Sequence, residues 1–122
     1  MSADLAILQG TWRVTELEVD GALMDKSALS EATVSVAGNR FTTAGMGAEY
    51  SGLLQLNETA SPKTLEMYFE SGPEAGNTNR GIYEISGSIW RMCLCMTGGL
   101  APLAFHTTPG SGYALETLIR LD

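Results

Sequence analysis

The chain has 122 residues, of which 44% are hydrophobic, and fourteen acidic against seven basic residues give it a net charge of −7. This size and composition predict a single globular domain over residues 1–122, with enough buried surface to fold without disulfide or metal staples. The acidic balance argues against binding to nucleic acid or to anionic membrane surfaces, and no apolar run has the length of a transmembrane helix.

The first residues carry neither a basic region nor a long apolar segment, so no signal peptide is expected and a cytoplasmic location is favoured. A secreted form whose signal has been removed stays open as an alternative. The two cysteines, Cys93 and Cys95, share one face of a predicted strand, at or beyond the normal Cα separation of a disulfide. We expect both to be reduced, half-buried and free of metal, because Cys-x-Cys alone lacks further ligands.

Apolar and polar residues alternate with period two along most of the chain, and turn signals recur at close intervals, which is typical of an antiparallel all-β barrel or sandwich. The first strand, Thr11–Val19, changes its apolar phase halfway, which predicts a bulge near Thr15-Glu16. Met24–Ala32 is the only segment with a helical pattern, and a helix there would cover one mouth of a barrel. Seven further strands are predicted: Thr33–Val36, Arg40–Thr43, Glu49–Asn57, Thr64–Glu70, Arg80–Ser86, Ser88–Met96 and Tyr113–Leu121.

The predicted fold is therefore an eight-stranded antiparallel up-and-down β-barrel with one short helix after the first strand. Eight strands suffice to close a barrel that holds either its own side chains or one small ligand. In the last strand, the apolar residues in phase are Leu115, Ile119 and Leu121. In the strand before it, one face consists of Trp90, Met92, Leu94 and Met96.

The opening Leu8-Gln9-Gly10-Thr11-Trp12, taken with Arg120 in the last strand, resembles the barrel-closing signature of lipocalins and fatty-acid-binding proteins. The indole of Trp12 and the guanidinium of Arg120 are expected to stack there as a cation–π pair. Further matching motifs, in order, are Gly21, Gly81-Ile82-Tyr83-Glu84, Gly87, Arg91-Met92-Cys93, Pro102, Phe105, Pro109-Gly110-Ser111-Gly112 and Leu115. Over nearly its whole length the chain resembles small bacterial lipocalin-like domains of the calycin superfamily, a group without an agreed activity. Such a fold hosts carriers, inhibitors, enzymes and interaction modules.

The side chains that this barrel would turn inward are the candidate ligand-binding residues: Phe41, Tyr50, Met67, Phe69, Tyr83, Trp90, Met92 and Leu94. They form either a packed core or the wall of an apolar cavity, to which methionines adapt well. No charged residue is assigned to this interior. A ligand is therefore expected to be neutral, or to place its head group at the mouth near Arg40, Arg80 or His106. The helix near Leu29 and the loop Gly98–Gly112 are expected to gate entry.

Signals for catalysis are weak. The only histidine, His106, lies in a loop rich in glycine and proline, and Gly110-Ser111-Gly112 does not form a nucleophile elbow. Glu66, Glu70 and Glu84 alternate away from apolar partners and are expected on the wet outer face of the barrel. We expect no enzymatic activity, cofactor or metal. The expected function is binding of a small hydrophobic or amphipathic ligand. The alternative is a protein-interaction module, such as an inhibitor or immunity-like partner, that uses the loops or the outer face of a filled barrel.

Overall fold

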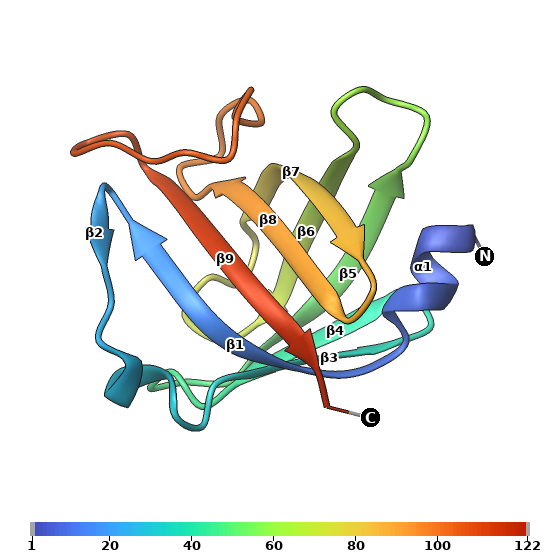
Figure 1. Cartoon of the computed structure of the whole chain (residues 1–122), viewed down its shortest axis with the longest axis horizontal. Helices are drawn as coiled ribbons and strands as arrows, with labels where there is room; N and C mark the ends of the chain where they lie inside the picture. Colours follow the sequence, from blue (N-terminus) through green and yellow to red (C-terminus); the bar gives the residue numbers. More distant parts are fainter. Residues whose placement is uncertain (1, 122) are drawn as a thin grey trace.

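Strands dominate the structure, a computed structural model that describes residues 2–121. Its elements are α1 (Ala3–Leu8), β1 (Gly10–Val19), β2 (Ala22–Leu23), the 3-10 helix η1 (Lys26–Leu29), β3 (Thr33–Ala37), β4 (Arg40–Ala44), β5 (Tyr50–Asn57), β6 (Thr64–Ser71), β7 (Thr78–Ser86), β8 (Ile89–Cys95) and β9 (Tyr113–Arg120). Neighbouring strands are antiparallel, and β1 pairs with both β3 and β9, so all strands but β2 close into a barrel (Figure 1). The predicted fold class, an all-β barrel of eight antiparallel strands, is confirmed.

The barrel closes on β1. The first half of this strand pairs with β3, and nearly its whole length pairs with β9, where Trp12 lies opposite Arg120. The register shifts between Val14 and Glu16, which confirms the predicted bulge. Because a bulge adds one residue to the strand, the buried face passes from Trp12 and Val14 to Leu17.

The segment predicted as a helix, Met24–Ala32, contains only the single 3-10 turn η1. Asp25 precedes this turn and makes no side-chain capping bond, so the segment lacks the cap that favours a longer helix. Before it, β2 pairs with the end of β1 and forms a short ribbon at the rim of the barrel. Leu29 is the buried residue of η1 and packs into the main core.

The α-helix of the structure, α1, lies before the first strand and was not predicted. The Ser2 hydroxyl accepts a hydrogen bond from the Leu5 N–H at 3.1 Å and caps its first turn. At the other end of the helix Leu8 is completely buried. The sequence did carry a signal for this helix: Leu5 and Leu8 are three residues apart and follow a capping serine, so they form one apolar face.

Around α1 the barrel is packed solid, and we call this part the closed end. Trp12 and Trp90 are both fully buried and meet edge to face, with ring centroids 5.6 Å apart. The guanidinium carbon of Arg120 lies 4.4 Å from the centre of the Trp12 ring, which confirms the predicted stacking. Arg120 also donates to the backbone carbonyls of Gln9, at 2.9 Å, and Ile7. The last strand thus holds both the first strand and the end of α1.

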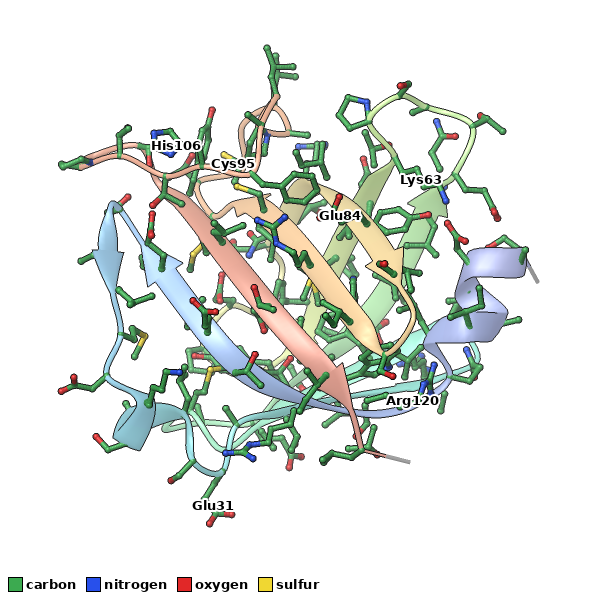
Figure 2. All side chains as sticks on the ribbon, viewed as in Figure 1. Glu31, Lys63, Glu84, Cys95, His106 and Arg120 are labelled. Carbon is green, nitrogen blue, oxygen red and sulfur yellow. The ribbon has the colours of Figure 1, made fainter. Side chains whose placement is uncertain are left out.

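A second contact fixes α1 to the wall of the barrel. One carboxylate oxygen of Asp4 accepts hydrogen bonds from the Tyr83 hydroxyl, at 2.7 Å, and from the Lys63 ammonium, at 2.9 Å. Lys63 is labelled in Figure 2. Burial by itself raises the pKa of Asp4, but the hydrogen bonds from Lys63 and Tyr83 outweigh it and hold the pKa below its ordinary value. Burial and the Asp4 carboxylate together raise the pKa of Tyr83 well above its ordinary value.

The outer face of the barrel carries the predicted acidic residues. Glu66, Glu70 and Glu84 are exposed, and each pairs with an arginine of another strand. These exposed ion pairs each contribute about 0–1 kcal/mol, so they add little to stability. The prediction that these three carboxylates face solvent is confirmed.

Candidate ligand cavity

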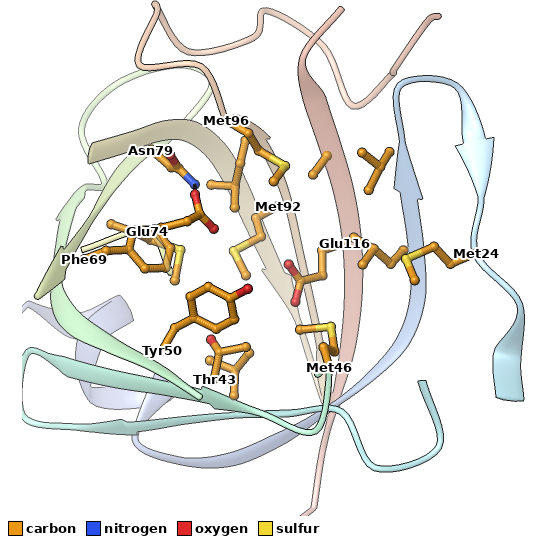
Figure 3. A pocket seen from close by; sticks show the side chains of 16 residues that line it. Met24, Thr43, Met46, Tyr50, Phe69, Glu74, Asn79, Met92, Met96 and Glu116 are labelled. Carbon is orange, nitrogen blue, oxygen red and sulfur yellow. Dashed lines mark hydrogen bonds between the residues drawn. The ribbon is translucent and has the colours of Figure 1, made fainter. Parts of the chain in front are cut away.

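At the end of the barrel opposite α1 the packing is incomplete. We call this part the open end; it lies where β1 finishes and β9 begins. A cavity of about 230 Å³ lies there (Figure 3). Its lining consists of Leu17, Val19, Met24, Val34, Thr43, Met46, Tyr50, Met67, Phe69, Glu74, Asn79, Met92, Leu94, Met96, Ala114 and Glu116.

The eight predicted interior residues divide between the two ends. Those that line the cavity are Tyr50, Met67, Phe69, Met92 and Leu94. The other three, Phe41, Tyr83 and Trp90, are at most 1% exposed and belong to the packed core instead. The two readings left open by the sequence, a filled core and a cavity, therefore both apply, each to one half of the barrel. Whether the five lining residues contact a ligand stays a prediction.

Methionine is the commonest residue in the lining. Five of the chain's six methionines lie there, namely Met24, Met46, Met67, Met92 and Met96. An unbranched thioether side chain adopts many shapes at little cost, so such a wall adapts to the outline of an apolar molecule. The aromatic rings of Phe69 and Tyr50 meet edge to face at 5.9 Å and form a more rigid part of the same wall.

A carboxyl group faces this apolar space, contrary to the prediction that the interior carries no charge. Glu116, on β9, is only 7% exposed, and its Oε1 has no hydrogen-bond partner among the described residues. Figure 3 shows the carboxyl group pointing into the cavity. Burial raises the pKa of Glu116 from its ordinary 4.5 to about 7. The group therefore changes its charge near neutral pH.

Glu116 was missed because β9 was assigned the wrong apolar phase. Its buried residues are Ala114, Glu116 and Leu118, whereas Leu115 and Ile119 lie on the other face. The correct phase was available from the sequence. Since Arg120 stacks on the inward-facing Trp12, the residues two and four positions before it must face inward as well.

Two more polar side chains, Asn79 and Glu74, line the same cavity. Asn79 is 2% exposed and its Oδ1 has no partner within residues 2–121, while its amide nitrogen donates to Glu74 at 3.4 Å. Glu74 comes from the loop between β6 and β7 and projects into the same space (Figure 3). Buried polar groups in proteins nearly always have partners, so two unfilled acceptors in one cavity need an explanation.

The basic residues expected at the mouth lie elsewhere. Arg40 pairs with Glu70 at 2.6 Å and Arg80 with Glu66 at 3.2 Å, both on the outer face, and neither arginine lines the cavity. His106 is exposed on the long loop between β8 and β9 and does not line it either. The prediction that these residues reach a head group is therefore wrong for this arrangement.

The long loop, residues 97–112, packs on the outside of the barrel and not across its mouth. Thr107 is buried; it donates to Glu18 and accepts from the Gly21 N–H at 2.9 Å. A Cβ on Gly21 would come within 2.9 Å of Pro109, so the missing side chain allows this close approach. On the outer face of β8, the guanidinium carbon of Arg91 lies 4.8 Å from the centre of the Phe105 ring, which belongs to the loop. These contacts do not support the predicted gating role of the loop.

The loop also covers the two cysteines, which are buried rather than half-buried. Cys93 donates a long hydrogen bond to the carbonyl oxygen of His106 at 3.7 Å, and Cys95 Sγ lies 3.3 Å from the Thr97 hydroxyl. Both thiols are free. Burial raises the pKa of Cys93. For Cys95 burial acts in the same direction, but hydrogen bonds from Thr97 and Gly99 outweigh it and lower the pKa.

Comparison with known proteins leaves the fold as the basis for classification: no family model, curated protein or solved structure matches the chain. The closed antiparallel barrel of eight strands is consistent with a lipocalin-like fold. Within residues 2–121 no helix is long and apolar enough to span a membrane. In the same part of the chain, no three His, Cys, Asp or Glu side chains are grouped so that they could hold a metal ion.

Proposed function

We propose that the protein binds a small amphipathic molecule in the cavity at the open end and that it is not an enzyme. The observation that carries this proposal is the volume of about 230 Å³ inside an otherwise tightly packed barrel. A cavity of about 150 Å³ holds a benzene molecule, so by proportion this one holds about nine non-hydrogen atoms. That size suits a monocyclic or short-chain compound and is too small to enclose a whole long-chain lipid.

The composition of the lining supports binding. A mainly apolar wall with a few polar groups is the usual form of a small-molecule site. Here the apolar part is adaptable because of its methionines, and the polar part consists of Glu116, Asn79, Glu74 and Thr43. A buried carboxyl group without a partner lowers stability, and such costs are found mainly where function requires them.

Two further observations support the proposals that the protein is not an enzyme and that it belongs to a lipocalin-like group. The sole histidine lies outside the cavity, and Glu116 Oε1 is hydrogen-bonded to no hydroxyl or thiol nucleophile among the described residues, so no activated nucleophile faces the bound molecule. The stacked Trp12 and Arg120 on the first and last strands support membership of the lipocalin-like group of the calycin superfamily.

The test is a titration with phenethyl alcohol, a neutral compound of suitable size. Binding is measured by calorimetry and by tryptophan fluorescence. Trp90 lies two residues before Met92, which lines the cavity, so its emission is expected to report occupancy. Met67→Trp fills the cavity and is expected to abolish binding. The matched control is Tyr68→Trp, which adds an indole to the outer face of the same strand, where Tyr68 is 42% exposed. Equal binding of phenethyl alcohol by wild type and Met67→Trp would refute the proposal. So would the absence of binding by wild type both for this alcohol and for an amine and an acid of the same shape.

The alternative, a protein-interaction module, rests on a different feature. Leu100 and Leu103 at the tip of the long loop are 86% and 90% exposed. Large apolar side chains so fully in water are typical of protein contact surfaces. The double variant Leu100→Ser/Leu103→Ser separates the two functions, because it removes this surface and leaves the cavity unchanged. If binding of phenethyl alcohol is lost in that variant, the two features are not independent.

A further inference from the structure

The unfilled polar groups of the cavity are both hydrogen-bond acceptors. They are Oε1 of Glu116 and Oδ1 of Asn79, each on a side chain more than nine-tenths buried. The only other buried side-chain atom without a partner in the described chain is Nε1 of Trp90, a donor that belongs to the packed closed end. A molecule that matches these two groups therefore brings N–H or O–H donors to them.

The charges around the cavity have one sign. Glu116 and Glu74 both line it, and within residues 2–121 no lysine, arginine or histidine does. The whole chain adds to this field with its net charge of −7. Such a field raises the local concentration of cations and disfavours anions at the mouth.

We propose that the cavity selects small amphipathic amines, with the ammonium group donating to the carboxylate of Glu116 and the apolar body resting against Met67, Met92 and Phe69. This inference rests on the proposed function and names its ligand class. Hydrogen bonds between two charged groups are shorter and stronger than those between neutral ones, and a dry, apolar wall strengthens them further. A carboxylate ligand of the same size would place two like charges in one small space.

Amine binding has a signature that a neutral ligand lacks. Burial holds the pKa of Glu116 near 7 in the empty cavity, so about half of the molecules carry a proton there at neutral pH. An ammonium ion stabilises the charged form, and the proton leaves for the solvent. The other titratable groups that line the space are Glu74, from the loop between β6 and β7, and Tyr50, from β5. Neither is a cation that competes for the carboxylate of Glu116.

The experiment compares three probes of similar shape: phenethylamine, phenethyl alcohol and phenylacetate. Titration calorimetry at pH 7 is expected to give the tightest binding for the amine and none for the acid. Glu116→Gln keeps the shape of the side chain and removes its charge. It is expected to weaken amine binding at least tenfold and to change alcohol binding less than twofold. The matched control, Glu84→Gln, alters an exposed carboxylate of the outer face and is expected to leave both affinities unchanged.

Proton release provides the second readout. Calorimetry in two buffers with different ionisation enthalpies is expected to show about half a proton released per amine bound by the wild type at pH 7. No proton release is expected when the amine binds to Glu116→Gln, and none when phenethyl alcohol binds to the wild type. Thermal unfolding of the empty Glu116→Gln protein checks that the variant folds.

The outcomes separate the two proposals. If phenethyl alcohol binds as tightly as phenethylamine, or if Glu116→Gln leaves amine affinity intact, the cavity binds ligands but the amine inference is wrong. If none of the three probes binds to the wild type, the proposed function itself fails. If phenylacetate binds tightest, Glu116 acts as a neutral acid, and the assignment of a cationic ligand is overturned.

Discussion

The two ends of this barrel are built from the same strands and follow opposite packing rules. At the closed end Trp12, Trp90 and Tyr83 fill the interior, and α1 and Arg120 seal it with hydrogen-bonded partners. At the open end the same strands carry methionines and an unpartnered carboxyl group around empty space. Close packing supplies stability, whereas a void and a buried unpaired polar group remove it. The stability gained by close packing at the closed end therefore offsets the stability lost at the open end.

The largest expected effect concerns the pH dependence of stability through Glu116. The pKa of this group is raised on folding, so the folded state binds the proton more tightly than the unfolded state does. The associated stability is fully present below about pH 4.5 and is lost as the pH rises to about 7. The shift corresponds to roughly 3 kcal/mol at about 1.4 kcal/mol per pH unit.

Glu116→Gln is expected to remove this loss, so the difference in unfolding free energy between variant and wild type grows over that pH range. Urea denaturation at a series of pH values measures it. Glu84→Gln is the control and is expected to follow the wild-type profile. Parallel profiles for wild type and Glu116→Gln would show that the carboxyl group is not buried in solution.

The next effect compares one substitution at the two ends. Leu65 and Met67 are two residues apart on β6, and both are buried, but only Met67 lines the cavity. Leu65→Trp forces an indole into a filled core and is expected to cost about 2–3 kcal/mol. Met67→Trp places the same ring beside empty space and is expected to cost less than about 1 kcal/mol. Denaturation midpoints give the ranking, and equal losses would mean that the two ends are packed alike.

A somewhat smaller effect is expected where the closed end is sealed. Arg120→Ala removes the stacking on Trp12 and the donors to Gln9 and Ile7, and we expect a loss of about 1–2 kcal/mol. Arg13→Ala is the control, because Arg13 is exposed on the same strand as Trp12, and its change is expected to stay within about 0.5 kcal/mol. An unchanged midpoint for Arg120→Ala would contradict the sealing role.

The smallest effect is expected for Asp4→Asn, at about 1 kcal/mol near neutral pH, because Lys63 remains partly exposed to solvent. The folded pKa of Asp4 is lowered, so its contribution is present above the ordinary pKa and is lost as the pH falls through the folded value. The difference between wild type and Asp4→Asn should therefore shrink in acid. This trend is opposite to that of Glu116, and one series of denaturation curves distinguishes the two ends.

The strands were predictable because a barrel wall imposes strict alternation, and every predicted strand has its counterpart. The bulge in β1 and the pair Trp12 and Arg120 were predicted from the same pattern. The failures occur where apolar residues lie on both faces of a strand. Leu115 lies on the outer face of the barrel, where Leu23 and Ile89 are also exposed, so hydrophobicity alone indicated the wrong phase for β9. This error concealed Glu116, the main polar residue of the candidate site.

The helical elements failed for a different reason. α1 has six residues and η1 four, so neither presents enough turns for a periodic pattern to stand out. Tertiary contacts define both instead. Leu8 is buried beneath Trp12, whose indole donates to the Leu8 carbonyl at 2.9 Å, and Leu29 enters the main core. Contacts of this kind join distant parts of the chain, which local sequence patterns do not show.

The attachment of the long loop to the outer wall has a consequence for protein engineering. Thr107 and Phe105 hold the loop at the side of the barrel, and the tip that carries Leu100 and Leu103 contributes no residue to the cavity lining. Exposed tips of this kind tolerate inserted sequence well. A peptide grafted between Leu103 and Ala104, which are both exposed, would be displayed on the surface without changing the interior. Recognition by the loop and occupancy of the barrel can therefore be redesigned separately.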